Sequence, residues 1–159
     1  MRIALSADHA GYQLKNELAA KLAQQGHDVL DLGTHSASPV DYPDSAEAMA
    51  AAIAEQQAER GIIVCGSGAG VSIAASKFPG VRAAVCHDTY TAHQAVEHDD
   101  MNVICLGARV VGPALALDLV TAFLAARFSG EARHQRRLDK IYDIERRFAG
   151  ADARLRRPV

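Results

Sequence analysis

The chain has 159 residues, a hydrophobic fraction of 49%, a charged fraction of 23% and a formal net charge of −2. These values predict one soluble globular domain, and the small net charge argues against general nucleic-acid binding. No apolar run approaches the roughly 20 residues that a membrane-spanning helix needs, and the apolar N-terminal segment is too short for a signal peptide.

Short apolar segments alternate with helical segments along the chain. The expected strands are residues 2–6, 27–32, 61–65, 81–86 and 102–106. The expected helices are one that begins near Gly11 and ends at Gly26, one over residues 46–59 capped by Asp44 or Ser45, one from about Val71, and three over 89–97, 113–128 and 132–148. Strands that are apolar on both sides and separated by helices are typical of a parallel sheet covered on both faces. We therefore expect an α/β fold with a five-stranded parallel sheet.

The end of the chain differs from the rest. The last expected helix carries an apolar stripe that includes Leu138, Ile141 and Phe148, with a polar break at Glu145. Residues 149–159 lack periodicity, which predicts a mobile C-terminal tail. We expect one domain over residues 1–148.

The segment GIIVCGSGAGVSIAASK (61–77) joins a strand to a helix through three glycines at alternate positions. A plain turn usually needs one glycine, whereas several allow the backbone to approach a ligand closely. The spacing is G-x-G-x-G, with Val71 where the dinucleotide fingerprint has its third glycine, so a nucleotide site is poorly supported. Such a loop directs backbone N–H groups at an anion.

Three cysteines without metal-type spacing indicate free thiols and a cytoplasmic protein. Cys105 lies within an apolar strand and Cys86 ends another, so packing is the simpler interpretation of both. Cys65 adjoins the glycine loop, where the local field favours the reactive thiolate. We interpret it as a catalytic candidate.

Other polar residues follow the strands or lie on the helices. Asp8 and His9 come directly after the first strand, where Asp8 either caps the next helix or joins the site. His98 can act as a general acid or base, whereas the histidine spacing does not favour a metal site. Arg133 and Arg137 share a helix face that suits a phosphate, although taken alone a solvated basic helix is the simpler interpretation.

Several separated segments carry a resemblance to a known family. They are IALSADHAGYQLK (3–15), DYPD (41–44), VCGSGAGVSIAASKFPGVRAAVC (64–86), EHDDMNVICLGARVVG (97–112) and RHQRRL (133–138). Together they resemble the type B ribose-5-phosphate isomerases, which share a family with the galactose-6-phosphate isomerase subunits. The resemblance extends to about residue 148.

The resemblance implies a Rossmann-like three-layer fold and a homodimer, or a dimer of dimers, with a C-terminal helix packed on the partner subunit. It implies an aldose–ketose isomerase without metal or cofactor, whose sites lie at the subunit interface. Cys65 is then the base, Ser67 and the N–H groups of Gly66, Gly68, Ala69 and Gly70 hold the enediolate oxygen, and His98 opens the sugar ring with Asp8. The implied substrate contacts are His9, Asp99, Arg109, Arg133, His134 and Arg137, the last three with His9 at the phosphate.

Two departures from the family pattern bear on the substrate. Ser67 replaces a common threonine and keeps the hydroxyl. Asp99 replaces a common asparagine, and an ionised carboxylate accepts hydrogen bonds but cannot donate them. A six-carbon substrate such as allose 6-phosphate or galactose 6-phosphate therefore stays open beside ribose 5-phosphate.

Two further alternatives belong to other classes. In a dinucleotide-binding oxidoreductase, Asp88 would bind the ribose. A non-catalytic sugar-phosphate-binding subunit is the other, although the presence of Cys65, His98 and both arginines on one chain favours a self-sufficient homodimer. Neither alternative involves a membrane or a nucleic acid.

Overall fold

The computed structural model describes residues 1–148, and the predicted tail, 149–159, lies outside these described residues. One sheet is formed by β1 (Arg2–Ala7), β2 (Asp28–Asp31), β3 (Arg60–Cys65), β4 (Ala83–Val85) and β5 (Val103–Gly107). The strand order is β2-β1-β3-β5-β4, and each neighbouring pair is parallel. The predicted five-stranded parallel sheet is confirmed.

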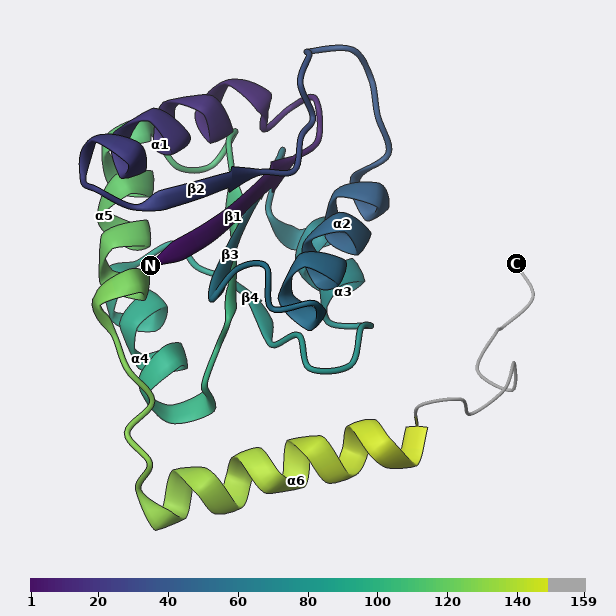
Figure 1. Ribbon diagram of the computed structural model, residues 1–159, viewed down its shortest axis with the longest axis vertical. Coiled ribbons are helices and arrows are strands. Elements are labelled where there is room, and N and C mark those ends of the chain that lie inside the picture. The colour runs from purple at the N-terminus through teal and green to yellow at the C-terminus, as the bar shows by residue number, and fades with distance from the viewer. Residues whose placement is uncertain (149–159) are drawn as a thin grey trace.

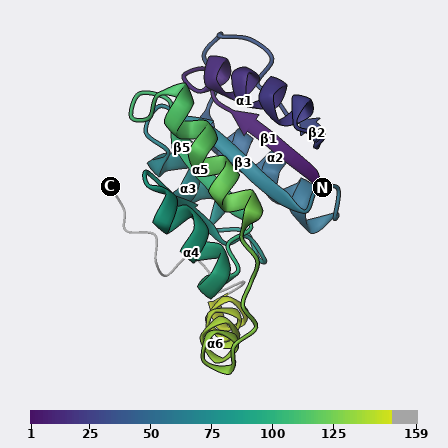
Figure 2. The ribbon, with the colours of Figure 1, turned by 90° about the vertical axis from the view of Figure 1, so that its left-hand side faces the viewer.

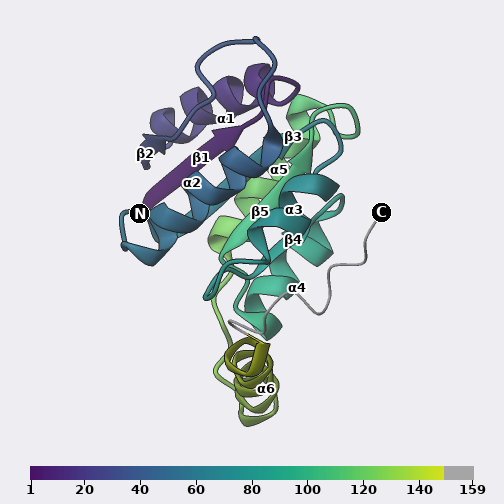
Figure 3. The same cartoon turned by 90° about the vertical axis from the view of Figure 1, so that its right-hand side faces the viewer.

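Helices cover both faces of this sheet. The helices of residues 1–148 are α1 (Tyr12–Gln24), α2 (Tyr42–Ala54), α3 (Ala69–Ala75), α4 (Thr89–Asp99), α5 (Pro113–Ala125) and α6 (Ala132–Phe148). Figure 2 shows α1, α4 and α5 on one face, and Figure 3 shows α2 and α3 on the other. The long helix α6 lies apart from these layers, beyond one end of the sheet (Figure 1). Within residues 1–148, no helix is both long and apolar enough to cross a membrane.

The sheet separates two hydrophobic cores. Ile62 and Val64 of β3 pack with α1, α4 and α5, whereas Ile63 and Cys65 pack with α2 and α3. This division follows from the alternation of side chains along a strand. Cys65 therefore ends its strand on the side of the sheet that α2 and α3 cover.

The start of α2 differs from the prediction. The helix begins at Tyr42, four residues before the predicted range of 46–59, and neither Asp44 nor Ser45 caps it. Pro43 stands in the first turn, where its missing N–H has no intrahelical partner to lose and its fixed φ suits the helix. Pro43, which lies before the predicted helix range, is therefore part of the helix start.

Other helix boundaries also move, and α2 ends at Ala54, five residues before the predicted end at residue 59. Helix α3 begins at Ala69, two residues before the predicted start, so Gly70 lies in its first turn. Helix α5 ends at Ala125 rather than at residue 128, where the chain becomes extended. The Arg60 guanidinium donates to the carbonyl oxygens of Phe123 and Ala126 there, which satisfies carbonyls left free by the helix end.

A substitution at Gly11 tests how closely α1 packs against β3. A Cβ atom at Gly11 would lie 2.2 Å from the Val64 carbonyl oxygen, so Gly11→Ala must push the start of α1 away from the sheet. We expect Gly11→Ala to lower the free energy of unfolding by about 2–3 kcal/mol in urea titrations, since overpacking of this kind is not relieved by a flexible side chain. Gly112→Ala is the control, because its Cβ would meet no atom within 4 Å. Equal stability of the two variants would contradict this packing.

Candidate active site

Three loops meet at the carboxyl edge of the sheet. Strand β1 lies between β2 and β3, so the chain order reverses there, and ligands of parallel sheets bind beside such a switch point. The loops that follow β1, β3 and β5 carry Asp8 and His9, the glycine loop, and Arg109. The strand order thus brings together three of the predicted groups.

Cys65 forms the floor of this edge. Its side chain is 5% exposed, and its Sγ accepts a hydrogen bond from the Gly68 N–H at 3.1 Å. Gly68 has a φ of +81°, a conformation that glycine adopts without strain and that turns this N–H back toward the sulfur. Ser67 and Ala69 are exposed beside it, with the Ser67 Oγ accepting from the Ala69 N–H at 3.3 Å.

The turn after β5 holds the glycine loop in place. The Ala108 N–H donates to the Cys65 carbonyl at 2.8 Å, and the Arg109 N–H donates to the Gly66 carbonyl at 3.0 Å. A Cβ at Gly107 would lie 2.7 Å from the Ser67 backbone, so the two backbones are in direct contact. The Arg109 side chain, exposed to solvent, lies beside Gly66. The loop is therefore rigid and carries a cation at its rim.

Asp8 and His9 are both fixed by backbone groups. The Asp8 Oδ1 accepts from the N–H groups of Ala10 at 2.9 Å and Gly11 at 3.0 Å, so Asp8 does hold the start of α1. The exposed His9 has its Nδ1 3.3 Å from both the N and the O of Val40, in the loop before α2. Within residues 1–148 the Nε2 atom of His9 makes no hydrogen bond, so it can contact a ligand.

Tyr42 is a site residue that sequence reasoning missed. Its ring lies against Gly70, where an added Cβ would come within 2.9 Å of a ring carbon, and the residue is 44% exposed. A flat, exposed ring at the edge of the glycine loop can pack against a small ligand. The only signal in the sequence was its position in the DYPD segment, to which no role was assigned.

The other two cysteines behave as packing residues. Burial, followed by the charge of Asp88, raises the pKa of the Cys86 thiol to about 11, and burial raises the pKa of the Cys105 thiol still further. Both are 0% exposed. Among the described residues, Cys65 is thus the cysteine at the carboxyl edge with a hydrogen-bond donor directed at its sulfur.

The remaining predicted residues form a second cluster. His98 and Asp99 lie in the last turn of α4, and Arg133, His134 and Arg137 lie in the first half of α6. The rings of His98 and His134 stack with centroids 4.0 Å apart. Arg133 pairs with Glu131 at 2.8 Å, whereas Arg137 makes no ion pair within residues 1–148. Both arginines are exposed and can reach an anion.

The two clusters lie at opposite ends of the sheet. Helix α4 starts after the carboxyl end of β4 and runs back, so its last turn, with His98, lies near the amino ends of the strands. Helix α6 lies beyond that same end (Figure 1). One chain therefore does not bring His98, Asp99 and the α6 residues to Cys65.

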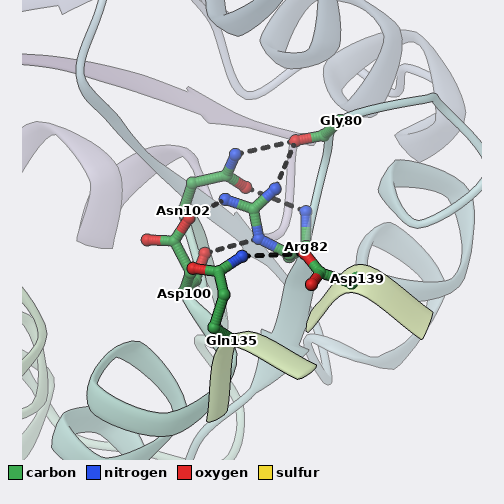
Figure 4. A network of polar contacts seen from close by, with 6 residues as sticks. All are labelled: Gly80, Arg82, Asp100, Asn102, Gln135 and Asp139. Carbon is green, nitrogen blue, oxygen red and sulfur yellow. Dashed lines mark hydrogen bonds and ion pairs between the residues drawn. The ribbon is translucent and has the colours of Figure 1, made fainter. Parts of the chain in front are cut away.

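A polar network shapes the surface on which α6 rests (Figure 4). The Arg82 guanidinium donates to the Asp100 carboxylate and carbonyl, both at 2.6 Å, and Asn102 bonds to the Gly80 carbonyl at 2.8 Å. Asp100 has a φ of +52°, held by these contacts. The same Arg82 lies 5.6 Å from the centroid of the Tyr142 ring on α6.

A groove of about 670 Å³ separates α6 from the segment 76–84. Gly80 and Glu145 both line this groove, and the Gly80 N–H donates to the Glu145 side chain at 2.8 Å, which explains the polar break in the apolar stripe. Ile141, Ile144 and Phe148 on this helix are 41%, 51% and 60% exposed. Exposed apolar side chains in a row on one helix mark a surface suited to protein contact.

One sequence alternative, the dinucleotide-binding oxidoreductase, is weakened by the geometry. The Asp88 carboxylate caps α4 by accepting from the Thr91 N–H at 2.7 Å, and this bond, with one from the Thr91 hydroxyl, lowers the pKa of Asp88. It is thus used as a cap rather than held ready for a nucleotide ribose. Within the part of the chain that the structure describes, no group of three His, Cys, Asp or Glu side chains could hold a metal ion.

Comparisons with known proteins agree with one another. Residues 3–141 match the family model described as ribose/galactose isomerase. Ribose-5-phosphate isomerase B of Escherichia coli K12 is 45% identical over 146 residues, 92% of this chain and 97% of that protein. D-erythrulose-4-phosphate isomerase of Pectobacterium atrosepticum is 44% identical over 132 residues, which cover 82% of this chain and 86% of that protein. The structure of Clostridium thermocellum ribose-5-phosphate isomerase B superposes with a TM-score of 0.91 at 48% identity, covering 93% of this chain and 99% of that one.

Alkylation can test the difference between the three thiols. At pH 8 a thiol with the pKa of Cys86 is ionised to about one part in a thousand, and Cys105 is ionised even less. We expect iodoacetamide to modify Cys65 at least about tenfold faster than the other two, as read by peptide mass spectrometry over time. Modification of Cys86 first would contradict the environments described above.

Proposed function

The chain belongs to the ribose/galactose isomerase family and is a sugar-phosphate aldose–ketose isomerase, and we propose that its reaction interconverts ribose 5-phosphate and ribulose 5-phosphate. The observation that carries the proposal is the family match over residues 3–141, with Cys65 at the floor of a glycine loop whose Gly68 N–H donates to its sulfur. A dinucleotide-dependent oxidation has no comparable support.

The proposed chemistry moves one proton between two carbons. The Cys65 thiolate removes the proton from C2 of the open aldose, and the electron pair moves through C1 to O1 to give an enediolate. Return of the proton to C1, with transfer of the hydroxyl proton from O2 to O1, gives the ketose. A preorganised N–H donor at a developing oxyanion contributes about 3–4 kcal/mol, and the loop formed by Gly66, Gly68, Ala69 and Gly70, with the Ser67 hydroxyl, offers such donors.

Ring opening and phosphate binding are assigned to the other residues. We assign His98 to the ring opening, in which a proton leaves the anomeric hydroxyl and another reaches the ring oxygen, with Asp8 assisting at that oxygen. His9, Arg109, Arg133 and Arg137 supply cations or donors for the phosphate, and Asp99 accepts from a sugar hydroxyl. Phosphate contacts far from the reacting carbons supply binding energy that orients the sugar.

These roles require two copies of the chain in one site. His98 and the α6 arginines lie beyond the opposite end of the sheet from Cys65, so they can serve a site only in a neighbouring subunit. A two-fold dimer supplies two such sites at once, because each chain offers both halves. The exposed apolar row of α6 suits this contact. We propose that α6 packs on the partner and carries its half of the site there.

A six-carbon phosphosugar is the second candidate substrate. The family description itself covers galactose as well as ribose, and Asp99 stands where the family commonly has asparagine. The reaction would be the same, with a longer sugar between the loop and the phosphate. Assays that compare turnover of allose 6-phosphate and galactose 6-phosphate with turnover of ribose 5-phosphate distinguish the two candidate substrates.

The base can be tested with a matched pair of cysteine variants. In the presence of a chelator, we expect turnover of ribose 5-phosphate by wild type and a roughly 10²–10⁴-fold lower kcat for Cys65→Ala with KM nearly unchanged, since only the proton transfer is lost. Cys86→Ala removes a thiol outside the site and should keep kcat within about threefold. Turnover retained in Cys65→Ala would move the base elsewhere, and turnover of hexose phosphates alone would favour the second candidate.

Subunit mixing can test the shared site. Each variant by itself, Cys65→Ala or His98→Asn, is expected to lose turnover of ribose 5-phosphate. In a mixed dimer one site combines both altered residues, while the other combines an intact Cys65 with an intact His98. Co-expressed chains should therefore regain about a quarter of wild-type activity, because half of the dimers are mixed and each has one intact site. Purified mixed dimers that stay inactive would show that both residues act within one chain.

A further inference from the structure

His134 is buried on a helix whose neighbouring residues are exposed. Its side chain is 1% exposed, while Arg133, Gln135 and Arg136 beside it face solvent. Its ring lies on the His98 ring, with centroids 4.0 Å apart and planes inclined by 31°. This imidazole is therefore in direct contact with the residue assigned to ring opening.

The polar atoms of His134 are also directed inward. Its Nδ1 lies 2.6 Å from the Ser129 Oγ, and the Ser129 N–H donates to the Glu97 carbonyl at 3.0 Å. Ser129 thus links His134 to the last turn of α4, which carries His98. The Nε2 of His134 is buried without a hydrogen-bond partner within the described residues, so neither ring nitrogen faces open solvent.

The charges around the pair favour a neutral His134. Burial lowers the pKa of His134, and the neighbouring His98 and Arg133 lower it further, although Glu131 opposes them. Two stacked imidazolium rings would repel each other, which also favours the neutral form of the buried His134. The Nδ1 of His98 faces the Gln94 side-chain amide nitrogen at 3.0 Å, and its Nε2 lies 3.9 Å from a Glu97 carboxylate oxygen.

We propose that His134 is a positioning residue that fixes the His98 ring for ring opening, rather than a direct ligand of the phosphate. The inference rests on the proposed function, in which His98 opens the sugar ring. It leaves the phosphate contacts of α6 to Arg133 and Arg137, whose side chains are exposed. The opposite role, a phosphate ligand, is what the family resemblance implies, and the two roles predict different kinetics.

A pair of substrates separates the two roles. Ribose 5-phosphate closes into a furanose, whereas erythrose 4-phosphate cannot, because phosphate esterifies the hydroxyl that would close the ring. Both carry a terminal phosphate. A residue needed for ring opening affects only the first substrate, while a phosphate ligand affects both. The variants are His134→Ala, which removes the ring, and His134→Phe, which keeps a flat ring without nitrogens; Arg136→Ala, an exposed neighbour on α6, is the control.

Positioning predicts a selective loss of kcat. For His134→Ala we expect kcat on ribose 5-phosphate to fall roughly 10–100-fold, the usual cost of misplacing a catalytic group, with KM within about threefold. Turnover of erythrose 4-phosphate should change less than about threefold, and His134→Phe should lie within about fivefold of wild type because stacking persists. Arg136→Ala should match wild type on both substrates.

Other outcomes overturn the inference. A raised KM on both substrates in His134→Ala and His134→Phe alike, with kcat kept, would make His134 a phosphate ligand. If the wild-type protein converts only ribose 5-phosphate, the kinetics on that substrate still separate the two roles. A lower kcat supports positioning, and a raised KM with kcat kept supports a phosphate ligand. If the wild-type protein converts neither sugar, or if His98→Asn affects turnover of both sugars equally, the proposed function fails. NMR then tests the contact between the His98 and His134 rings by itself. Ring-proton signals of His98 that do not move in His134→Ala would overturn the positioning role.

Discussion

The direction of a parallel sheet governs where each candidate residue lies. Every strand ends at the same edge, so Asp8, Cys65 and Arg109 meet there without special design. Each covering helix must run back, so the last turn of α4, with His98, lies near the other edge. A mechanism that needs both Cys65 and His98 is therefore a mechanism for two chains. The connectivity of the fold is thus an argument for the proposed dimer.

The attachment of α6 is the second condition for such a shared site. This helix is outside the layered body, and within the described residues few contacts hold it: the buried Leu138, the stacked histidines, the Arg82–Tyr142 contact and the Gly80–Glu145 hydrogen bond. Each contact meets a segment near the amino ends of the strands, which the network of Arg82, Asp100 and Asn102 fixes. The orientation of the α6 arginines thus depends on residues that take no part in catalysis.

Much of the fold and part of the site could be predicted from the sequence. The apolar runs predict the sheet, and the glycines predict the Cys65 loop. Both predictions depend on local properties of the chain: the alternation of side chains, the backbone freedom of glycine and the burial of apolar residues. The start of α2 could not be predicted, since Pro43 suits a loop and a first helical turn equally. Tyr42 was missed because its contact with Gly70 joins residues distant in sequence. The burial of His134 also depends on a tertiary contact, and from the sequence its helix face is polar.

In the proposed arrangement, both chains contact the sugar at both of its ends. Cys65 and the glycine loop hold the carbons that exchange the proton, and the arginines on α6 of the partner join His9 and Arg109 at the phosphate. The accepted length of sugar then depends on how α6 packs and on residues such as Asp99 at the α4 end, rather than on the proton-transfer group. Relatives named for a tetrose phosphate and a pentose phosphate share this fold at similar identity, as expected if the chemistry stays fixed while the spacing between the halves changes. In the proposed dimer, substrate choice would therefore depend on subunit packing as much as on the residues that touch the sugar.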